Sequence, residues 1–319
     1  LLHESIIEAG KIAKKYFNKT IKQWDKSPNN PVTEVDYAVN DSLLENLLNK
    51  RNSYGWLSEE SDDSNIRLSK DYVWVVDPID GTKAFIQKKP EFTISIALIH
   101  QSKPILGAIY NPITEELFEA EIGKGAFLNG KKIQVTKNES LSEGNFLGGK
   151  MFLSNNKNLA KKAKFSFINS IAYRMALVAK GEYDGTVTLS NKSDWDIAAA
   201  QLIATEAGAY ISNINGKVPT YANSSTSGLG IICAGKNLHG LLLDLTYPIV
   251  EKFNTSSDKI KEFGFMATKS EDRKKIQLLH LVIGGELLDP NKSEFKNLNK
   301  LDFVEEMIMA NNHDYMLFF

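Results

Sequence analysis

Two aspartates stand three residues apart where an apolar stretch ends, in the sequence YVWVVDPIDGTKAF of residues 72–85. The β-branched and aromatic residues 72–76 predict a buried strand, and Pro78 and Gly81 predict that a turn begins at Asp77. Aspartate is common in turns, so the pair needs no functional explanation by itself. Two carboxylates at one strand end could also bind a divalent cation, which prefers several oxygen ligands.

Three further acidic residues lie beside predicted helices and strands. Glu59 follows the short apolar run GWLS, and Asp36 lies three residues after Thr33, where the pattern predicts a capping box at a helix start. Asp196 lies in the first turn of another predicted helix, after Trp195. Each position has a structural explanation, because acidic residues favour helix N-termini and exposed loops. As a group, they are the ligands with which two cations about 4 Å apart clamp a phosphoryl group.

The turn of residues 77–82 offers backbone groups as well as carboxylates. Asp77 could bridge two cations and Asp80 could be a terminal ligand, while the turn directs the carbonyl of Ile79 toward the same point. Gly81 lets the backbone approach a phosphate closely, so that its amide and that of Thr82 would face the phosphate. The Thr82 hydroxyl could orient an attacking water.

Four motifs, in this order along the chain, resemble one known family. LSEE, WVVDPIDGT, GKGAFLNGKKI and WDIAAAQLIATEAGA are similar to motifs of the inositol monophosphatase-like, Mg²⁺-dependent and Li⁺-sensitive phosphatases. The resemblance covers about residues 1–247. It implies hydrolysis of a phosphomonoester by metal-activated water, with two or three Mg²⁺ ions per site.

The resemblance also implies a role for each matching residue. It implies metal ligands at Glu59, Asp77, Ile79 (through its carbonyl), Asp80 and Asp196. It implies catalytic roles on the attacking water for Asp36, Glu59 and Thr82. It implies substrate contacts from Gly81, Thr82, Lys83, Ser170 and Arg174.

Within the superfamily, GWLSEES, DGTKAF and EFTISIALIHQSKPILGAIYNP look closest to the 3′(2′),5′-bisphosphate nucleotidases. This implies removal of the 3′-phosphate from adenosine 3′,5′-bisphosphate, a by-product of sulfate activation, with Arg174 meeting the 5′-phosphate. Ala84 and Ala209 depart from the family patterns, which leaves the substrate open. One alternative is an inositol phosphate or another sugar or polyol phosphate. An alternative of another class is a regulatory or binding protein that acts through its C-terminal module.

The composition of the chain limits its partners. Its 319 residues are 42% hydrophobic with a net charge of −1, so it is globular and has no basic field for a nucleic-acid polymer. No apolar run is long enough for a transmembrane segment. The single cysteine, Cys233, fits a reducing compartment, and we expect a cytoplasmic protein. The resemblance implies a possible homodimer and a small phosphate ester as substrate.

The pattern of the sequence predicts an α/β layered sandwich with mixed, largely antiparallel sheets, and the family resemblance implies the αβαβα order of an α+β fold. Helices are expected over residues 1–20 and after Thr33, with a Pro/Asn-rich loop over 24–36. Strands follow one another through residues 92–133 without crossover helices, the first of them half-buried, which favours antiparallel pairing. We expect phosphatase halves at about 1–143 and 144–247, a linker at 248–264, and a small appended α/β module at 265–319.

Overall fold

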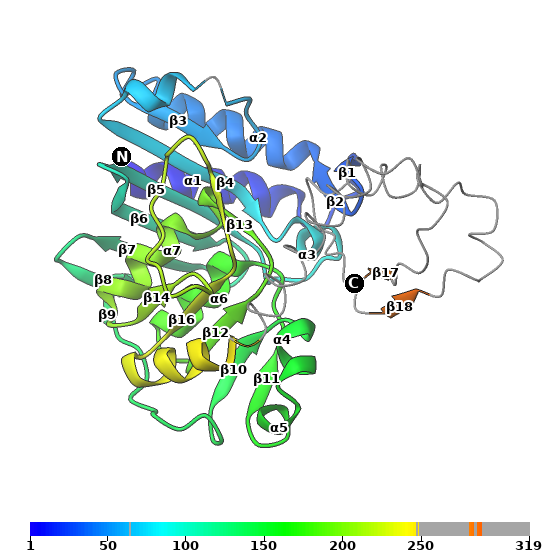
Figure 1. The fold of residues 1–319 in the computed structure, drawn as a ribbon. Coiled ribbons are helices and arrows are strands. Elements are labelled where there is room, and N and C mark those ends of the chain that lie inside the picture. The colour runs from blue at the N-terminus through cyan, green and yellow to red at the C-terminus, as the bar shows by residue number, and fades with distance from the viewer. Residues whose placement is uncertain (64, 247, 249–280, 284–285, 289–319) are drawn as a thin grey trace, which may run out of the picture. The chain divides into compact units, whose positions relative to one another are not determined.

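The structure is a computed structural model that describes residues 1–63, 65–246, 248, 281–283 and 286–288 (Figure 1). The chain divides into two compact units, Leu1–Leu243 and Asp244–Phe319, and each is considered by itself. No helix in the described part of the chain has both the length and the apolar composition needed to cross a membrane.

A seven-stranded sheet forms the centre of the first unit. Its strands, in spatial order, are β3 (Gly55–Ser58), β4 (Tyr72–Asp80), β5 (Thr93–His100), β6 (Lys103–Asn111), β7 (Glu116–Glu121), β8 (Gly125–Leu128) and β9 (Lys131–Ile133). β3 and β4 run parallel, and every later neighbour pair is antiparallel. The prediction of antiparallel strands without crossover helices over residues 92–133 is therefore confirmed.

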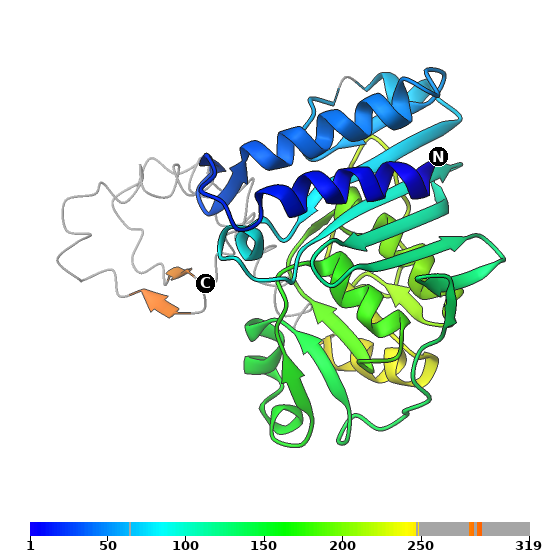
Figure 2. The same cartoon turned by 180° about the vertical axis from the view of Figure 1, so that it is seen from behind.

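Two N-terminal helices cover one face of this sheet. They are α1 (Leu2–Tyr16) and α2 (Glu34–Leu43), and α2 continues into a π-helical turn over Leu44–Leu48. Figure 2 shows the two helices in blue, side by side along the sheet. Ile6 and Val39 pack there with Trp74 and Ile94, all nearly or fully buried. Burial of this apolar surface fixes α2, and with it Asp36, against β4.

Two buried helices, α6 (Ile171–Ala179) and α7 (Asp194–Glu206), cover the opposite face of the sheet. α7 approaches β6 so closely that a Cβ on Gly107 would lie 3.0 Å from the carbonyl oxygen of Ala199. The small side chains of Ala198, Ala199 and Ala200 allow this approach. The first turn of α7, which carries Asp196, is thereby held close to the seven-stranded sheet.

A five-stranded mixed sheet lies on the other side of α6 and α7. Its spatial order is β11 (Lys164–Ser166), β10 (Asn145–Gly148), β12 (Gly185–Thr188), β16 (Ile231–Ala234) and β14 (Tyr210–Ser212). A helix beginning at residue 236 buries Leu238 and Leu242, and Leu242 lies close to Gly185 of β12. The predicted sandwich of alternating helical and sheet layers is thus confirmed.

Smaller elements connect these layers. They are α3 (Thr82–Ile86), α4 (Lys150–Asn155), α5 (Lys157–Ala160), a 3₁₀ helix over Ile66–Ser69, and the short antiparallel pair β13 (Lys192–Ser193) and β15 (Ser227–Gly228). α7 begins where the sequence predicted a helix around Asp196.

The Pro/Asn-rich loop predicted over residues 24–36 is wrong. The segment forms an antiparallel hairpin of β1 (Gln23–Ser27) and β2 (Asn30–Thr33). Asn29 adopts a left-handed conformation with φ of 62°, which asparagine tolerates better than most residues, and this closes the turn. Pro31 fits because a two-stranded ribbon leaves the outer edge of each strand unpaired, so a missing N–H is tolerated.

Two predictions about strands also need correction. β4 does not end at Asp77 but continues to Asp80, with an irregularity between Asp77 and Asp80 in its pairing with β5. β5 is not half-buried, because residues 93–99 are buried on both faces. Its alternate residues pack under different helix layers, Ile96 beneath α1 and α2 and Ala97 beneath α6 and α7. Small and polar residues on one face had suggested exposure to solvent.

Beyond residue 248, the described part of the second unit consists of two short strands. β17 (Leu281–Ile283) pairs antiparallel with β18 (Glu286–Leu288), whereas the apolar run IQLLHLVIGGELLDP predicts a single strand. The predicted helix in LDFVEEMIMANN and the linker at 248–264 lie outside the described residues, apart from residue 248.

Candidate metal centre

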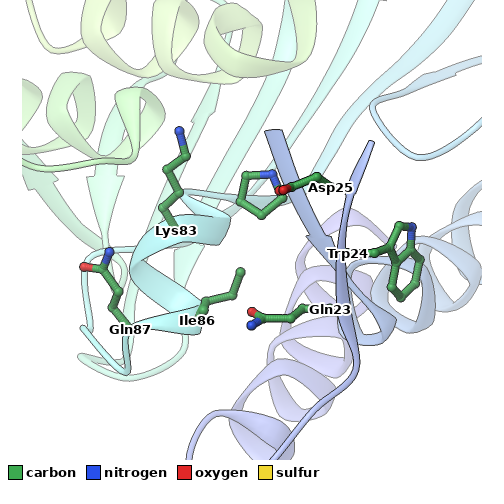
Figure 3. Close-up of a pocket in the computed structure, with 7 residues that line it drawn as sticks. Gln23, Trp24, Asp25, Lys83, Ile86 and Gln87 are labelled. Carbon is green, nitrogen blue, oxygen red and sulfur yellow. The ribbon is translucent and has the colours of Figure 1, made fainter. Parts of the chain in front are cut away.

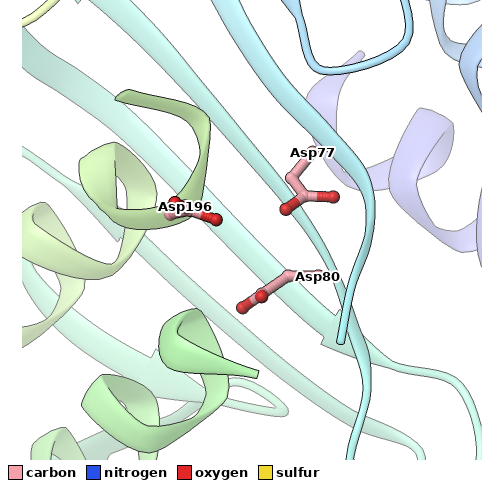
Figure 4. A group of neighbouring side chains, drawn as sticks. All are labelled: Asp77, Asp80 and Asp196. Carbon is pink, nitrogen blue, oxygen red and sulfur yellow. The ribbon is translucent and has the colours of Figure 1, made fainter. Parts of the chain in front are cut away.

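Three aspartates from two elements meet at one point in the first unit. Asp77 and Asp80 come from the end of β4, and Asp196 comes from the first turn of α7 (Figure 4). Each offers one carboxylate oxygen, and the three oxygens all lie within 4.8 Å of one another. We call Asp77, Asp80 and Asp196 the aspartate cluster. The sequence prediction that these three carboxylates share a site agrees with this geometry.

Backbone amides orient two members of the cluster. The amide of Ile79 donates to Asp77 Oδ1 at 3.0 Å, across the irregular end of β4. The amide of Ser193 donates to Asp196 Oδ2 at 2.8 Å, at the start of α7. Each carboxylate therefore has one oxygen engaged with the backbone, which limits its rotation.

Asp80 is held by the start of α6. The Ser170 hydroxyl donates to Asp80 Oδ2 at 2.6 Å, and the amide of Ala172 donates to the same oxygen at 2.7 Å. Ser170 is also the N-cap of α6, since its hydroxyl accepts a hydrogen bond from the amide of Tyr173. Asp80 thus lies where the helix dipole favours negative charge.

The cluster places negative charges in a region with little solvent. Burial, followed by the charges of Glu59 and Asp80, raises the pKa of Asp77 well above its usual value. Burial and the charge of Asp196 raise the pKa of Asp80 to about 7. Buried carboxylates in mutual repulsion are stabilised by a shared cation. A set of hard oxygen donors suits Mg²⁺, Mn²⁺ or Ca²⁺, so these residues fit a divalent metal ion.

Asp36 and Thr82 form a second polar group beside the cluster. The Thr82 hydroxyl lies 3.1 Å from Asp36 Oδ1 and 3.1 Å from the carbonyl oxygen of Ile79, and it can donate to one of them at a time. The predicted capping box is confirmed, because the amide and the hydroxyl of Thr33 donate to Asp36 Oδ2 at 2.9 and 2.5 Å. Burial raises the pKa of Asp36 to about 6. The carboxylate can therefore accept a proton near neutral pH.

Glu59 lies after β3, and its charge reaches the cluster, although it is not one of the three residues within 4.8 Å. A cation that the sequence did not indicate lies against it. Lys26, on the β1–β2 hairpin, approaches Glu59 Oε1 and Glu60 Oε1, each at 2.8 Å. Burial is the largest influence on the pKa of Glu59 and raises it, whereas Lys26 opposes this shift. The only available signal was a lysine in a segment of turn residues, which is too common to indicate a role.

The predicted substrate residues fall into different environments. Gly81 has a φ of 97°, which strongly favours glycine, and a Cβ there would lie 3.1 Å from the carbonyl of Glu91 and 3.2 Å from Ser170 Cβ. Ser170 has no exposed surface, and its hydroxyl faces Asp80. Lys83 is exposed and lines a cavity of about 330 Å³ between α3 and the hairpin (Figure 3).

Arg174 is 5% exposed and lies on the same helix as Ser170. Its Nε donates to the carbonyl of Ile168, and its guanidinium carbon lies 4.6 Å from the ring centroid of Phe167. Burial lowers the pKa of Arg174 to about 10, and the charge of Asp80 opposes this shift. The guanidinium is therefore charged at neutral pH and close enough to Asp80 for the two charges to interact.

Comparison with known proteins decides the family. Residues 2–251 match the Inositol monophosphatase family. The chain belongs to this family. The resemblance stated from the motifs is thereby confirmed. The three aspartates for which it implies metal-binding roles are the ones that meet in the aspartate cluster, and those roles stay a prediction.

The similar proteins named here share about a quarter to a third of their aligned residues with this chain. Inositol monophosphatase 3 of Solanum lycopersicum is 33% identical over 226 residues, which are 67% of this chain and 84% of that protein. Inositol monophosphatase of Dictyostelium discoideum is 32% identical over 259 residues, or 77% and 92%. The crystal structure of the extragenic suppressor protein suhB from Bartonella henselae has a TM-score of 0.71 at 27% identity, covering 77% of this chain and 96% of that one. This protein is thus a phosphatase of the inositol monophosphatase family.

Proposed function

We propose that this phosphatase hydrolyses the monophosphate of a small polyol such as inositol, with Mg²⁺ bound at the aspartate cluster. The observation that carries the proposal is the set of three carboxylate oxygens within 4.8 Å of one another, two of them on residues that are at most 6% exposed. The names of the Solanum and Dictyostelium relatives support the substrate class. The number of ions, two or three, stays a prediction.

The residues at the aspartate cluster would bind the metal ions. Asp77, Asp80 and Asp196 would hold the metal ions, with Glu59 and the carbonyl of Ile79 beside them. When bound, Mg²⁺ supplies positive charge to the phosphate and lowers the pKa of water.

The attacking water and the phosphate meet other groups. Thr82 can donate its proton to Asp36 and accept one from water, so that Asp36 draws the water proton through the hydroxyl. The backbone at Gly81 and Thr82 would contact the phosphate, and Lys83 would add positive charge at the rim of the site.

A nucleotide 3′,5′-bisphosphate is the second candidate substrate, because one specific residue favours it. Such a substrate carries a second phosphate, and Arg174 offers a charged guanidinium that interacts with Asp80. Its Nε is engaged with Ile168, and guanidinium groups match phosphate oxygens with two parallel hydrogen bonds. Hydrolysis of adenosine 3′,5′-bisphosphate and inhibition by Li⁺ therefore stay in this proposal as the second alternative.

One substrate panel separates these alternatives. Phosphate release is measured with inositol 1-phosphate, adenosine 3′,5′-bisphosphate, fructose 1,6-bisphosphate and histidinol phosphate, each with Mg²⁺ and with excess EDTA. The proposal predicts the highest kcat/KM for inositol 1-phosphate and no turnover in EDTA. Preference for the nucleotide would favour the second candidate. No release from any of the four would contradict both.

The binding-protein alternative places the function in the second unit. A chain of residues 1–248 retains every residue proposed above to act on metal or substrate. We expect it to release phosphate within about twofold of the full chain, because the cluster is built from β4 and α7 of the first unit. Loss of activity in a folded 1–248 chain would show that the second unit contributes to the site.

A further inference from the structure

Ser170, at the start of α6, contacts the aspartate cluster directly, which a substrate-binding role would not require. Ser170 forms one hydrogen bond to a residue of the aspartate cluster and two to groups that hold Ser170 itself. We propose that Ser170 is a positioning residue that fixes the Asp80 carboxylate for the metal ion, and that it does not contact the substrate. This inference rests on the proposed metal-dependent function.

The hydroxyl of Ser170 has no capacity left for a substrate. It can donate one proton, and the 2.6 Å contact with Asp80 Oδ2 uses that proton because a carboxylate only accepts. It accepts from the amide of Tyr173 at 2.9 Å, so Thr93 Oγ1, at 3.1 Å, must be the donor in the third contact. These contacts use the donor and both acceptor positions of the hydroxyl. Ser170 also has no exposed surface, so its hydroxyl acts on the metal centre through Asp80.

The same contacts determine how Asp80 presents its two oxygens. Oδ2 receives both the Ser170 hydroxyl and the Ala172 amide, at 2.6 and 2.7 Å. Among the described residues, no hydrogen-bond donor approaches Oδ1, which leaves that oxygen for a cation. Two donors on one oxygen fix the rotation of the carboxyl group, so Asp80 is oriented before metal binds. Removal of a group that orients a metal ligand in this way commonly weakens metal binding by roughly 10-fold to 100-fold.

Ser170 also lies against the proposed phosphate-binding backbone. A Cβ on Gly81 would be 3.2 Å from Ser170 Cβ and 3.3 Å from its amide nitrogen. The turn after β4 therefore rests on the start of α6 at the same residue that holds Asp80. One residue thus sets the relative position of a metal ligand and the backbone that follows it.

Metal binding to the full chain tests this inference without an activity assay. Titration calorimetry gives Kd for Mg²⁺, and for Mn²⁺ as a second probe, in the wild type, Ser170→Ala, Ser170→Gly and Thr93→Val. Both Ser170 variants lose the hydroxyl, but glycine caps helices nearly as well as serine, so only Ser170→Ala also weakens the cap. Thr93→Val is the matched control, because it removes a neighbouring buried hydroxyl and leaves the bond from Ser170 to Asp80 in place. Melting temperatures in EDTA record the structural cost of each change.

We expect Kd to rise about tenfold or more in both Ser170 variants and to stay within about twofold in Thr93→Val. A positioning role predicts that Kd rises in every variant that lacks the Ser170 hydroxyl, whether or not its melting temperature falls. Wild-type Kd values in Ser170→Gly, or equal weakening in Thr93→Val, would overturn the inference while the proposed function stands. A wild type that binds neither ion would overturn the proposed function, and this inference with it.

Discussion

Arg174 shows at the scale of one residue how substrate choice can be tested. Its guanidinium is buried beneath Phe167 and interacts with Asp80, four residues away from Ser170 on α6. Such a group either receives a second phosphate of the substrate or serves only the packing of α6. The two roles differ in what happens when the charge alone is removed.

Arg174→Met removes the charge but keeps an unbranched apolar stem over Phe167. If Arg174 receives a second phosphate, KM for adenosine 3′,5′-bisphosphate should rise about tenfold or more, which corresponds to about 1.4 kcal/mol. KM for inositol 1-phosphate should barely change, since it has no second phosphate. Steady-state kinetics with both substrates measures the difference. Equal losses on both would show that Arg174 is structural or contacts the phosphate that is cleaved.

Residues differed in how well the sequence predicted them. Asp77, Asp80 and Asp196 stand in motifs whose spacing ties them to a strand end and a helix start, so their convergence could be inferred. Lys26 could not, because its contact with Glu59 joins two separate segments of the chain, which no local pattern encodes. The burial of Ser170 likewise depends on packing between α6 and the turn after β4.

At the scale of an element, one lysine of the β1–β2 hairpin forms ion pairs with two glutamates that follow β3. Lys26 connects the hairpin to Glu59 and to Glu60, whose side chain is 2% exposed. Lys26→Met should lower the free energy of unfolding of the metal-free protein by about 1 to 2 kcal/mol, because a nearly buried carboxylate loses its partner. We expect a loss near the low end of this range, because the Lys26 side chain is 24% exposed and its charge is therefore partly solvated. Urea denaturation measures the change.

The control for this prediction is Lys22→Met, the same substitution at an exposed lysine just before the hairpin. It should change the free energy of unfolding by less than about 0.5 kcal/mol. Equal stability of Lys26→Met and the wild type would mean that the ion pair does not hold the hairpin in place.

Helices and strands with regularly spaced apolar residues could be predicted from the sequence. The hairpin, which contains many turn residues, could not. The spacing of Ile6, Ala9 and Ala13 indicated α1, and alternation indicated the strands over 92–133. The hairpin was read as a loop because Pro28, Asn29 and Pro31 dominate it. β5 was read as half-buried because helices on both faces of the sheet cannot be inferred from one strand.

At the scale of the molecule, the buried carboxylates of the first unit should make its stability depend on both pH and bound metal. The folded-state pKa values of Asp36, about 6, and Asp80, about 7, exceed the unfolded value of about 3.9. The folded metal-free protein therefore binds more protons than the unfolded chain between about pH 4 and 7, and these groups make it less stable as pH rises through that window. Metal needs the deprotonated carboxylates, so it acts in the opposite direction.

Melting temperatures with and without Mg²⁺ at pH 5.5 and 7.5 measure this coupling. The increase caused by saturating Mg²⁺ should be larger at pH 7.5, where the carboxylates are deprotonated and repel one another. An equal increase at both pH values would contradict the assignment of Asp80 to the metal centre and of Asp36 to a position beside it.

At the scale of the molecule, the antiparallel order of the strands over residues 92–133 could be predicted, because short turns between strands exclude crossover helices. The first unit ends at Leu243, whereas the halves at 143/144, the module at 265–319 and a homodimer stay predictions.

The central claim is that metal ions at the aspartate cluster drive phosphate release. Phosphate release from inositol 1-phosphate, titrated with Mg²⁺ in the wild type, Asp77→Asn and the exposed control Asp71→Asn, tests it most directly. Asparagine can still accept the bond from Ile79, so the fold should persist. We predict that Asp77→Asn lowers turnover more than about 100-fold and weakens activation by Mg²⁺, while Asp71→Asn matches the wild type. Near-wild-type turnover by Asp77→Asn, with unchanged dependence on Mg²⁺, would contradict the account.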